Sequence, residues 1–502
     1  MGNQIQWQEI QGWGRVIGGL WLVLGMLILV GPSSVEAQGT PYASLTSELD
    51  TLFAEWDGTR NPGMAVAAIR GDSIAVTRGY GMADLERGLP VTESSVFDLA
   101  SVSKHFTGLI LARLATEGTI DLDADIRTYL PDYPDMGYTV TPRHLVHNTS
   151  GVRDWVELIW LSGWRFDDVI SMRDLWNLAT DQKRLNFAPG AEYAYSNTGF
   201  NLLTMIVEEV LGVPFDEYLS SEFLEPAGMR NTSVQTDHLT VVRNRTESYQ
   251  PKADRNGFER LTNNTSGVGS SSVLSSAEDM LLWLQYLNRM EADHPEEAQL
   301  FRTRAVLNSG DTLSYAFGIN VGDFGGHRAL SHGGSWRGYR SHILHLPEHE
   351  VAVFVVSNST QFSAAPAARA VARVLLPEVS FSTDQGPMES ETEGGGESDG
   401  LAVDTTWVSE ESAEFTGVFW SEELRVHLRV EESGSGGVVL DHHIHGPSEL
   451  VPGQRDTFTL DGIRGTQTLR FSRNADGEIE SFSLDGARFR GIEFRRAHDP
   501  GR

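Results

Sequence analysis

The apolar positions repeat first with a helical period and then with a strand period. Residues 41–56 predict an amphipathic helix, whose apolar face consists of Leu45, Leu49, Leu52, Phe53 and Trp56. Residues 64–81 show two short apolar runs on either side of Gly71 and Asp72, a pattern typical of two strands joined by a tight turn. The folded part of the chain is therefore expected to begin with a helix and a strand pair.

The middle of the chain, from about residue 95 to residue 300, is rich in helical patterns, and strands return near residue 340. Residues 341–358 predict a hairpin that turns at Pro347, and residues 366–377 predict a closing helix. Because strands stand at both ends with helices between them, we expect one α/β domain over residues 41–378, whose sheet draws on both ends.

Two further regions differ from this domain. Residues 379–403 are rich in glycine, serine and acidic residues and contain no basic residue, which is typical of a solvated linker. Residues 404–497 contain short apolar strands separated by turn residues, which predicts a small antiparallel barrel or sandwich. A chain of 502 residues has room for both domains.

The N-terminus has the pattern of a targeting segment. Arg15 precedes an apolar run over residues 16–30, and "VEA" ends at Ala37 with small residues where cleavage needs them. We therefore expect residues 1–37 to be a signal peptide and the rest of the chain to be periplasmic or secreted. An uncleaved membrane anchor is the alternative, although the run is shorter than the ~20 apolar residues of a spanning helix.

Composition narrows the range of partners and chemistries. The chain carries 39 basic and 69 acidic residues, a net charge of −30, which disfavours nucleic acid and anionic membrane surfaces as partners. It contains no cysteine, so disulfides, thiol catalysis and cysteine-based metal sites are excluded. A small molecule or a peptide is the expected partner.

One polar pair interrupts an otherwise apolar helix. Residues 97–114 predict a largely buried helix, yet Ser101 and Lys104 lie one turn apart on the same face. Burial disfavours the charged form of a lysine, and a neutral amine can accept the proton of a nearby serine. If Ser101 begins the helix, its backbone N–H can donate to an oxyanion. The alternative interpretation is a lysine that snorkels from the end of the helix.

The scarcity of lysine strengthens the chemical interpretation. Lysine occurs three times, at Lys104, Lys183 and Lys252, so 39 − 3 = 36 of the basic residues are arginine. Arginine stays protonated in proteins, so a lysine on a buried helix favours a role that needs a removable proton. Ser101 and Lys104 also form the only Ser-x-x-Lys in the chain.

A second segment offers partners for this pair. Tyr195 and Asn197 stand at a predicted loop-to-helix boundary. A tyrosine near a lysine can act as a base, and an asparagine can donate to a substrate carbonyl. Another Tyr-x-Asn, formed by Tyr286 and Asn288, lies inside a predicted amphipathic helix and is more simply a part of its surface and core.

A third segment, "LSHGGSWRGYRS", places His332, Gly333, Gly334 and Ser335 at the start of a predicted strand. Glycines let a backbone approach a ligand closely. The backbone N–H of Ser335 could then supply a second oxyanion donor.

These three segments, in this order, resemble the serine β-lactamase and penicillin-recognising hydrolase family. The nearest branch contains class C β-lactamases, D,D-carboxypeptidases, D-aminopeptidases and related esterases. The resemblance covers about residues 42–378 and includes "PRHLVHNTSGV" and "SSVLSSAEDM". It implies an α/β fold, with an antiparallel sheet flanked by helices and a helical subdomain. Residues 404–497 resemble the lipocalin-like β-domain appended to D-aminopeptidase-type members.

The resemblance implies a role for each residue of the first two segments. Ser101 would be the acylating nucleophile, and Lys104 with Tyr195 the proton-transfer pair. Asn197 would bind the substrate amide, and the backbone amides of Ser101 and Ser335 would form the oxyanion hole.

The third segment would line the substrate site through His332, Gly333 and Gly334. His332 stands where class C β-lactamases carry lysine, a departure that favours peptidase- or esterase-like members over efficient β-lactam hydrolysis. Arg337 or Arg340 would hold a substrate carboxylate, or else make ordinary surface salt bridges.

Three other motifs match catalytic or metal-binding patterns in an unsuitable context. Residues 396–400 spell Gly-x-Ser-x-Gly inside the acidic linker, where no strand and helix flank the serine. Residues 345–349 spell His-x-x-Glu-His around a proline in a predicted turn. His443 and His445, next to His442, would share a strand face and could bind a metal there, but coincidence is the simpler interpretation.

The sequence thus predicts an exported serine hydrolase that works through an acyl-enzyme on Ser101 and needs no metal or cofactor. Small peptides with D-residues, peptidoglycan stems or short esters are the expected substrates. Two alternatives stay open: a true class C-like β-lactamase, and a non-catalytic protein that binds or senses penicillin or peptides.

Overall fold

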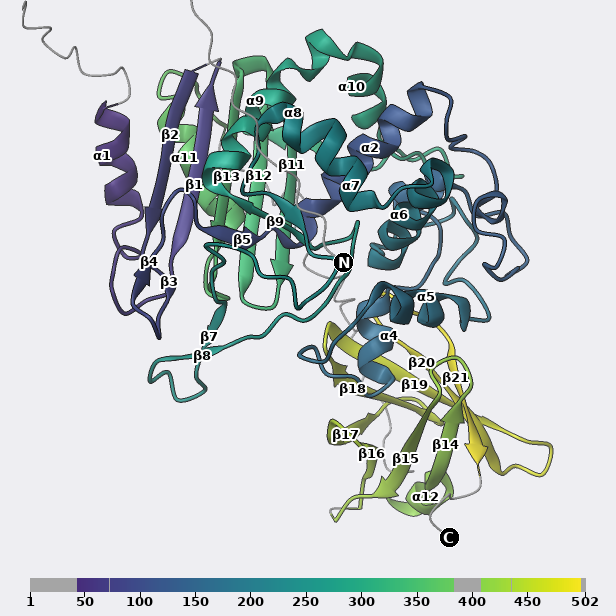
Figure 1. Cartoon of the computed structure of the whole chain (residues 1–502). Helices are drawn as coiled ribbons and strands as arrows, with labels where there is room; N and C mark the ends of the chain where they lie inside the picture. Colours follow the sequence, from purple (N-terminus) through teal and green to yellow (C-terminus); the bar gives the residue numbers. More distant parts are fainter. Residues whose placement is uncertain (1–42, 72, 383–407, 435, 498–502) are drawn as a thin grey trace, which may run out of the picture. The chain divides into compact units, whose positions relative to one another are not determined.

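A central antiparallel sheet draws its strands from both ends of the larger domain. The computed structural model describes residues 43–71, 73–382, 408–434 and 436–497. The strand order is β10-β11-β12-β13-β1-β2, and β1 pairs with β13 along its whole length, so the sheet draws on both ends of the domain, as predicted (Figure 1). The strands are β1 (Met64–Arg70), β2 (Ser73–Tyr80), β10 (Asn320–Phe324), β11 (His327–Trp336), β12 (Tyr339–Leu346) and β13 (Val351–Ser357).

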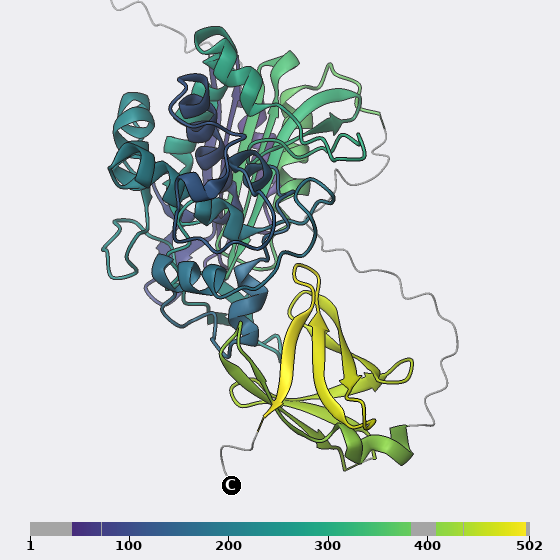
Figure 2. The same ribbon diagram turned by 90° about the vertical axis from the view of Figure 1, so that its right-hand side faces the viewer.

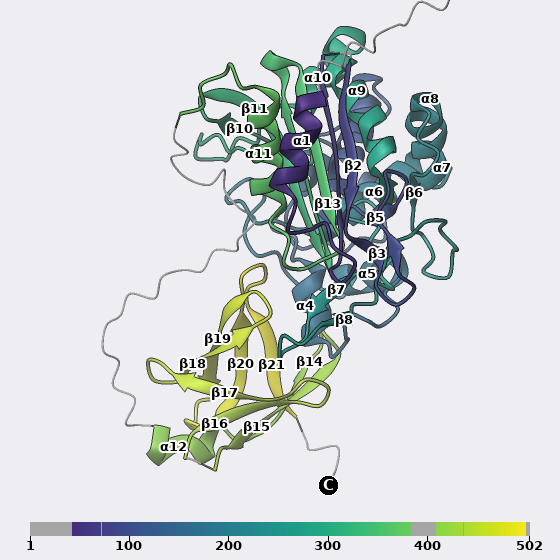
Figure 3. The ribbon, with the colours of Figure 1, turned by 90° about the vertical axis from the view of Figure 1, so that its left-hand side faces the viewer.

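Helices cover both faces of this sheet. The closing helix α11 (Ala364–Leu375) packs on β12 and β13, whereas α9 (Ala277–Asp293) packs on β1, β2 and β13. Figure 3 shows α11 and α9 on the two sides of the sheet. The predicted hairpin is confirmed, because β12 and β13 pair on either side of the short turn η4 (Pro347–His349).

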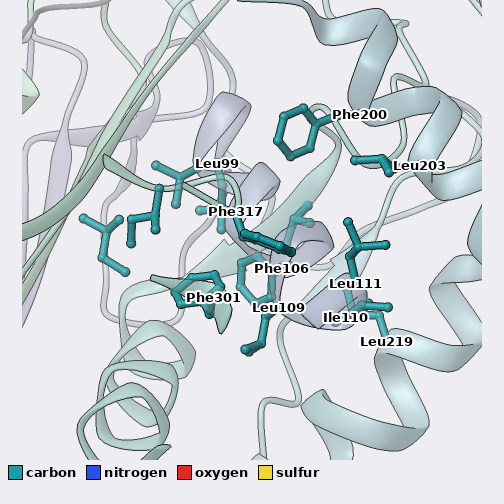
Figure 4. Close-up of a cluster of buried hydrophobic side chains, with 14 of the residues drawn as sticks. Leu99, Phe106, Leu109, Ile110, Leu111, Phe200, Leu203, Leu219, Phe301 and Phe317 are labelled. Atoms are coloured by element: carbon teal, nitrogen blue, oxygen red, sulfur yellow. The ribbon is translucent and has the colours of Figure 1, made fainter. Parts of the chain in front are cut away.

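The helix α2 (Lys104–Thr116) is buried on nearly all sides, as its apolar pattern predicts, but it starts later than the predicted residue 97, because Val96–Asp98 form the strand β5 and Ala100–Ser103 the short turn η1. Phe106, Leu109 and Ile110 are fully buried among side chains from other helices and loops, and Figure 4 shows this cluster. Gly108 lets a loop approach the helix backbone, because a Cβ there would lie 2.0 Å from the carbonyl oxygen of Phe317. The helix is therefore held rigidly from several directions.

Short helices and strands complete the larger domain. They are β3 (Met82–Asp84), β4 (Leu89–Pro90), β5 (Val96–Asp98), η1 (Ala100–Ser103), η2 (Ile126–Thr128), α3 (Pro142–Val146), α4 (Trp155–Leu161), α5 (Met172–Thr180), α6 (Asn197–Leu211), α7 (Phe215–Leu219), the π-helix η3 (Ser220–Leu224), α8 (Glu225–Ala227), β6 (Ser233–Val234), β7 (Tyr249–Pro251), β8 (Phe258–Arg260), β9 (Val273–Ser276) and α10 (Pro295–Phe301). Within the described ranges, no single helix is long and apolar enough to cross a membrane. Only α6 together with the bent stretch Phe215–Ala227, at 81° to it, meets that length and composition.

The first predicted helix is shorter than expected. We predicted a helix over residues 41–56, but α1 (Ala43–Leu52) ends at Leu52 and the next four residues form turns. Phe53 is buried after the helix end, with its ring 5.5 Å from that of Tyr80 on β2, whereas Leu52 is 39% exposed. Leu49 and Phe53 are thus both buried although the helix stops between them.

The C-terminal strands form a closed barrel, so of the two predicted arrangements the barrel is confirmed. Each strand pairs with the next, and β14 pairs with β21 to close the ring (Figure 2). The strands are β14 (Gly417–Ser421), β15 (Val426–Glu432), β16 (Val438–His442), β17 (Gly446–Pro452), β18 (Thr457–Gly462), β19 (Gly465–Arg473), β20 (Ile479–Asp485) and β21 (Ile492–Ala497). Phenylalanines fill its core, among them Phe419, Phe458, Phe471, Phe482 and Phe494.

Two details of the barrel differ from the prediction. Residues Val408–Phe415 form a helix, α12, where we expected strand, and Phe415 is buried in the barrel core. The strand β16 ends at His442, so His443 and His445 lie in a turn and do not share a strand face. Local alternation cannot show where a strand stops, because the turn over residues 443–445 is set by the pairing of β16 with β17, in which His442 lies opposite Gly446.

Candidate active site

Ser101 lies in the tight turn η1, immediately before the buried helix α2. The preceding residue, Ala100, has a φ of +49°, a conformation that costs an L-residue about 1–3 kcal/mol. Asp98 Oδ1 accepts a hydrogen bond from Ala100 N at 2.7 Å, and Asn263 donates to the other oxygen of Asp98, also at 2.7 Å. Burial raises the pKa of Asp98. The surroundings thus hold the strained turn that presents Ser101.

The strand β11 presses against this turn at Gly334. A Cβ at residue 334 would lie 2.3 Å from the carbonyl oxygen of Leu99 and 2.2 Å from Ser341 Oγ. Ser341, on β12, donates to the same carbonyl oxygen at 2.6 Å. Only a glycine permits this approach, which brings the following residue, Ser335, to the pocket beside Ser101.

Lys104 is fully buried, and three neutral oxygen atoms accept hydrogen bonds from it. Its Nζ donates to Asn197 Oδ1 at 2.6 Å, to the carbonyl oxygen of Ser270 at 2.7 Å and to Ser101 Oγ at 3.2 Å. Nζ also lies 4.8 Å from the centre of the Tyr195 ring. The structure therefore brings together Ser101, Lys104, Tyr195 and Asn197, which the sequence singled out as one site.

A cavity of about 130 Å³ opens at Ser101. It is lined by Ser101, Trp155, Val156, Tyr195, Asn197, Ser270, Ser271, Ser335, Trp336, Arg464 and Arg488. The last two arginines come from the C-terminal barrel, on loops that follow β18 and β20. The barrel therefore contributes two arginines to the lining of the pocket of the larger domain.

Asn197 is engaged at both ends of its side-chain amide. Its Oδ1 accepts from Lys104, while its Nδ2 and its backbone N each donate to Asp154 Oδ1 at 3.0 Å. Asp154 is fully buried, and Arg488 donates to its other oxygen at 3.0 Å. Asn197 thus orients Lys104 from within the protein, a role that the sequence did not indicate.

Sequence reasoning missed the residues that come from distant segments. Asp154 follows the noted "PRHLVHNTSGV", and Ser270 lies beside the noted "SSVLSSAEDM", so both family landmarks pointed near them. Nothing local distinguished Arg464 and Arg488 from the other arginines of the barrel. Arg488 pairs with Asp154, which is 334 positions away, and such a distant pairing leaves no periodic signal in the sequence.

His332 is not part of the pocket lining. The residue is fully buried, its Nδ1 lies 2.6 Å from the carbonyl oxygen of Gly333, and its Nε2 lies 3.2 Å from the hydroxyl of Tyr315. The first contact needs a proton on Nδ1, so Nε2 accepts from Tyr315. Burial, and then the charge of Lys104, lower the pKa of His332 to about 3. The imidazole is therefore neutral where class C β-lactamases carry a lysine.

The two arginines of the third segment point to backbone oxygens and away from the pocket lining. Arg337 donates through Nε to the carbonyl oxygen of Thr262 at 2.8 Å, and Arg340 donates to those of Arg337 and Tyr339 at 3.0 and 2.7 Å. Neither of them, nor Gly333, lines the cavity at Ser101, where Arg464 and Arg488 stand instead. The substrate-carboxylate role predicted for Arg337 or Arg340 has no geometric support.

Of the other motifs, the structure describes the histidine pattern at residues 345–349 but not the Gly-x-Ser-x-Gly. The Gly-x-Ser-x-Gly of residues 396–400 lies outside the described residues, as do the predicted signal peptide and most of the linker. His345 is on β12 and His349 is in the turn η4, so the two share no helix face. In the described part of the chain, no group of three or more His, Asp or Glu side chains is arranged to hold a metal ion.

Comparison with known proteins assigns the chain to a family. A family model described as Beta-lactamase matches residues 49–376, which is more than half of the chain. The protein belongs to the beta-lactamase family, and its fold is a beta-lactamase-like α/β domain followed by an eight-stranded closed barrel.

Individual relatives agree with this assignment. A D-aminopeptidase of Gluconobacter oxydans (strain 621H) is 29% identical over 337 residues, which are 66% of this chain and 62% of that protein. A D-aminopeptidase of Brucella anthropi is 26% identical over 428 residues, 84% of this chain and 78% of that protein. The structure of a penicillin-binding protein homologue from Pyrococcus abyssi has a TM-score of 0.59 at 20% identity, over 91% of this chain and all of that one.

Proposed function

We propose that this protein is a serine hydrolase that cleaves amide bonds through an acyl-enzyme on Ser101. The observation that carries the proposal is the 3.2 Å contact between Lys104 Nζ and Ser101 Oγ, made at the base of the only Ser-x-x-Lys in the chain. Lys104 is fully buried, burial favours the neutral form of a lysine, and a neutral amine can take the serine proton.

Acylation would proceed in two steps. Ser101 Oγ attacks the carbonyl carbon as its proton passes to the neutral Lys104 Nζ, and a tetrahedral oxyanion forms between the backbone amides of Ser101 and Ser335. The C–N bond then breaks, and the leaving amine takes a proton from the Lys104–Tyr195 pair. An ester bond now joins the substrate acyl group to Ser101.

Deacylation would repeat the same chemistry with water. The Lys104–Tyr195 pair removes a proton from a water molecule as its oxygen attacks the ester carbon. The bond between the acyl carbon and Ser101 Oγ breaks, Oγ recovers the proton, and the carboxylic acid leaves. Every proton is returned, so the cycle needs no cofactor.

The relatives support small peptides or amides with an N-terminal D-residue as the substrate class, because both curated relatives are named D-aminopeptidase. The small cavity agrees with a short substrate. Peptidoglycan stems and short esters, which were also expected from the sequence, present the same reacting carbonyl. The neutral, buried His332 weighs against efficient β-lactam hydrolysis.

Hydrolysis of matched enantiomers tests this function. We expect the full chain to release p-nitroaniline from D-alanine p-nitroanilide faster than from the L-enantiomer, with nitrocefin turned over slowly. Ser101→Ala should abolish the release. Rapid nitrocefin turnover would favour the β-lactamase alternative, and stable binding of penicillin without turnover would favour the sensing alternative. Equal rates for Ser101→Ala and the unmodified chain would contradict the proposed nucleophile.

We also propose that the protein is exported. Within residues 1–37, three features support a cleaved signal peptide: the positive charge of Arg15, the apolar run that follows it, and the small residues that end at Ala37. N-terminal sequencing of the protein from its native cell should find a chain that starts after Ala37. A mature chain that retains Met1 and resists extraction from membranes would instead support the uncleaved anchor.

A further inference from the structure

The barrel loop between β20 and β21 is fixed in the larger domain by hydrogen bonds at several positions. The carbonyl oxygen of Arg488 accepts from Asn186 Nδ2 at 2.9 Å, and the backbone N of Arg490 donates to Asn186 Oδ1 at 2.8 Å. Asp154 N donates to the same carbonyl oxygen of Arg488 at 3.3 Å. The guanidinium of Arg488 is therefore delivered to the pocket by a well-held backbone.

From this guanidinium, a chain of hydrogen bonds reaches the nucleophile. Arg488 donates to Asp154 Oδ2, Asp154 Oδ1 accepts from Asn197 Nδ2, and Asn197 Oδ1 accepts from Lys104 Nζ, at 3.0, 3.0 and 2.6 Å. Lys104 in turn donates to Ser101 Oγ. The chain crosses from the barrel to the reacting atom in four contacts.

The order of donors and acceptors in this chain has a chemical consequence. A side-chain amide has one accepting end and one donating end. Because ionised Asp154 only accepts, it holds Asn197 with its NH₂ toward the carboxylate and its oxygen toward Lys104. A neutral residue 154 hydrogen-bonded the other way would turn the NH₂ toward the lysine, which could then not donate to it.

The charge of Asp154 needs a partner, because the residue is fully buried. The side chain of Arg488 is 10% exposed and pairs with it directly. The guanidinium of Arg488 also lies 4.6 Å from the centre of the Tyr195 ring, while Lys104 Nζ lies 4.8 Å from that centre. Two cations near one phenol favour loss of a proton from Lys104 or from Tyr195.

Two further titratable side chains, Glu157 and His332, interact with members of this hydrogen-bonded chain. Glu157, one turn along α4 from Asp154, interacts with Arg464 and Arg488, and burial followed by the Asp154 charge raises the pKa of Glu157 to about 7. His332, which lies near Lys104, is neutral. Arg488 is therefore the cation that directly balances Asp154 on the pocket side.

We propose that Arg488, supplied by the C-terminal barrel, is a positioning residue of the Ser101 site: through Asp154 it holds Asn197 with its oxygen turned toward Lys104, and its own charge beside the Tyr195 ring favours loss of a proton from the Lys104–Tyr195 pair. The proposal rests on the proposed function of that site. It assigns to the barrel a part in setting the protonation state of the base, beyond closing the pocket.

Lysine-selective ¹³C NMR of the full chain tests the proposal without the need for a substrate. The chain has three lysines, so Lys183→Arg and Lys252→Arg identify the Lys104 signal. In Arg488→Gln we expect the titration midpoint of Lys104 to rise by about one pH unit, because a nearby cation is lost. In Asp154→Asn/Arg488→Gln, which removes both charges, the midpoint should return toward that of the unmodified chain.

A matched control comes from the same loop. Arg490 pairs with Glu192, both about half exposed, so Arg490→Gln should leave the Lys104 midpoint unchanged. An unchanged midpoint in Arg488→Gln, or equal shifts in Arg488→Gln and Arg490→Gln, would overturn the proposal.

Labelling of Ser101 by a fluorophosphonate separates this outcome from failure of the proposed function. We measure the labelling rate as a function of pH. In Arg488→Gln, the acidic limb of this pH profile should move to higher pH by the same amount as the Lys104 midpoint. If the unmodified chain is labelled normally and Arg488→Gln keeps its pH profile, the positioning role is wrong while the nucleophile stands. If the unmodified chain is not labelled at all, the proposed function fails, and the NMR midpoint still decides the role of Arg488.

Discussion

Lys104 and Arg153 are both buried cations, yet their surroundings differ in kind. Lys104, at the start of α2, donates its hydrogen bonds to neutral oxygens of Ser101, Asn197 and Ser270. Arg153, just before α4, donates to the carboxylate of Glu423 in the barrel at 3.1 Å. Lys104 thus donates to neutral dipoles, whereas Arg153 donates to a full opposite charge.

The difference indicates what each region needs. A lysine held by neutral oxygens can lose its proton without leaving an unbalanced carboxylate behind, which suits a base. Arg153 also donates to Gln182 and to the carbonyl oxygen of Arg490, at 2.8 and 2.6 Å, and arginine keeps its charge in proteins. Arg153 therefore ties the barrel to the larger domain as a fixed charge.

Lys104→Arg has the largest expected effect, and it tests whether Lys104 acts as a base or only as a fixed charge like Arg153. The substitution keeps the positive charge but removes the base, so we expect hydrolysis of D-alanine p-nitroanilide to fall by about 10²–10⁴-fold. Lys183→Arg is the matched control, because Lys183 is exposed and pairs with Glu422 at the surface. Activity of Lys104→Arg within a few-fold of the control would show that Lys104 serves only as a fixed charge.

Arg153→Gln tests the other side of the comparison. Arg153→Gln removes one partner of a buried ion pair and leaves the carboxylate of Glu423 without an opposite charge beside it. We therefore expect the free energy of unfolding to fall by about 3–5 kcal/mol. Urea unfolding followed by tryptophan fluorescence measures it. The control is Arg425→Gln, which removes an exposed arginine paired with Asp181 and should cost less than about 1 kcal/mol.

Glu157→Gln extends the comparison to a buried acid in the same region. Burial, and then the Asp154 charge, raise the pKa of Glu157 from 4.5 to about 7, so the folded chain binds this proton more tightly than the unfolded chain. The contribution of Glu157 to stability is therefore present below about pH 4.5 and is lost as the pH rises through about 7.

Glu157→Gln should remove this loss and make the chain more stable at alkaline pH than the unmodified protein, by at most about 3 kcal/mol. Urea unfolding in mildly acidic and in alkaline buffer measures the two slopes. Identical pH dependence of the two chains would show that Glu157 keeps its ordinary pKa.

Gly334→Ala sharpens the account of how Ser101 is presented. The new Cβ would meet the carbonyl oxygen of Leu99 at 2.3 Å, so β11 or the nucleophile turn must shift, at a cost of about 1–3 kcal/mol. We expect a lower rate of Ser101 labelling together with a lower unfolding midpoint. Gly434→Ala, where a Cβ meets nothing within 4 Å, should change neither measurement.

Much of the larger domain could be predicted because its signals are local. The apolar runs of β1, β12 and β13 and the polar pair on the buried helix are visible within a few residues of each other. The same holds for the Ser101–Lys104 spacing, which the structure realises as a direct contact. Helical periodicity and an unusual lysine were thus enough to single out two residues that the structure brings into contact.

The rest depends on contacts between distant segments. Asp154 and Arg488 come together only when the loop between β20 and β21 packs against the start of α4. Neither residue interrupts a local pattern in the sequence. For the same reason, Arg337 and Arg340 seemed suitable by position but turn to backbone oxygens. The helix before the barrel and the turn at His443 also follow from tertiary packing, which overrides short-range alternation.

Mapping the covalent adduct tests the central claim most directly. The full chain is treated with a fluorophosphonate and with a fluorescent penicillin, its intact mass is measured, and the modified peptide is sequenced. The account predicts a single adduct on Ser101, formed much more slowly in Lys104→Arg. An adduct on another serine, such as Ser398 of the Gly-x-Ser-x-Gly motif, or no adduct with either reagent, would contradict it.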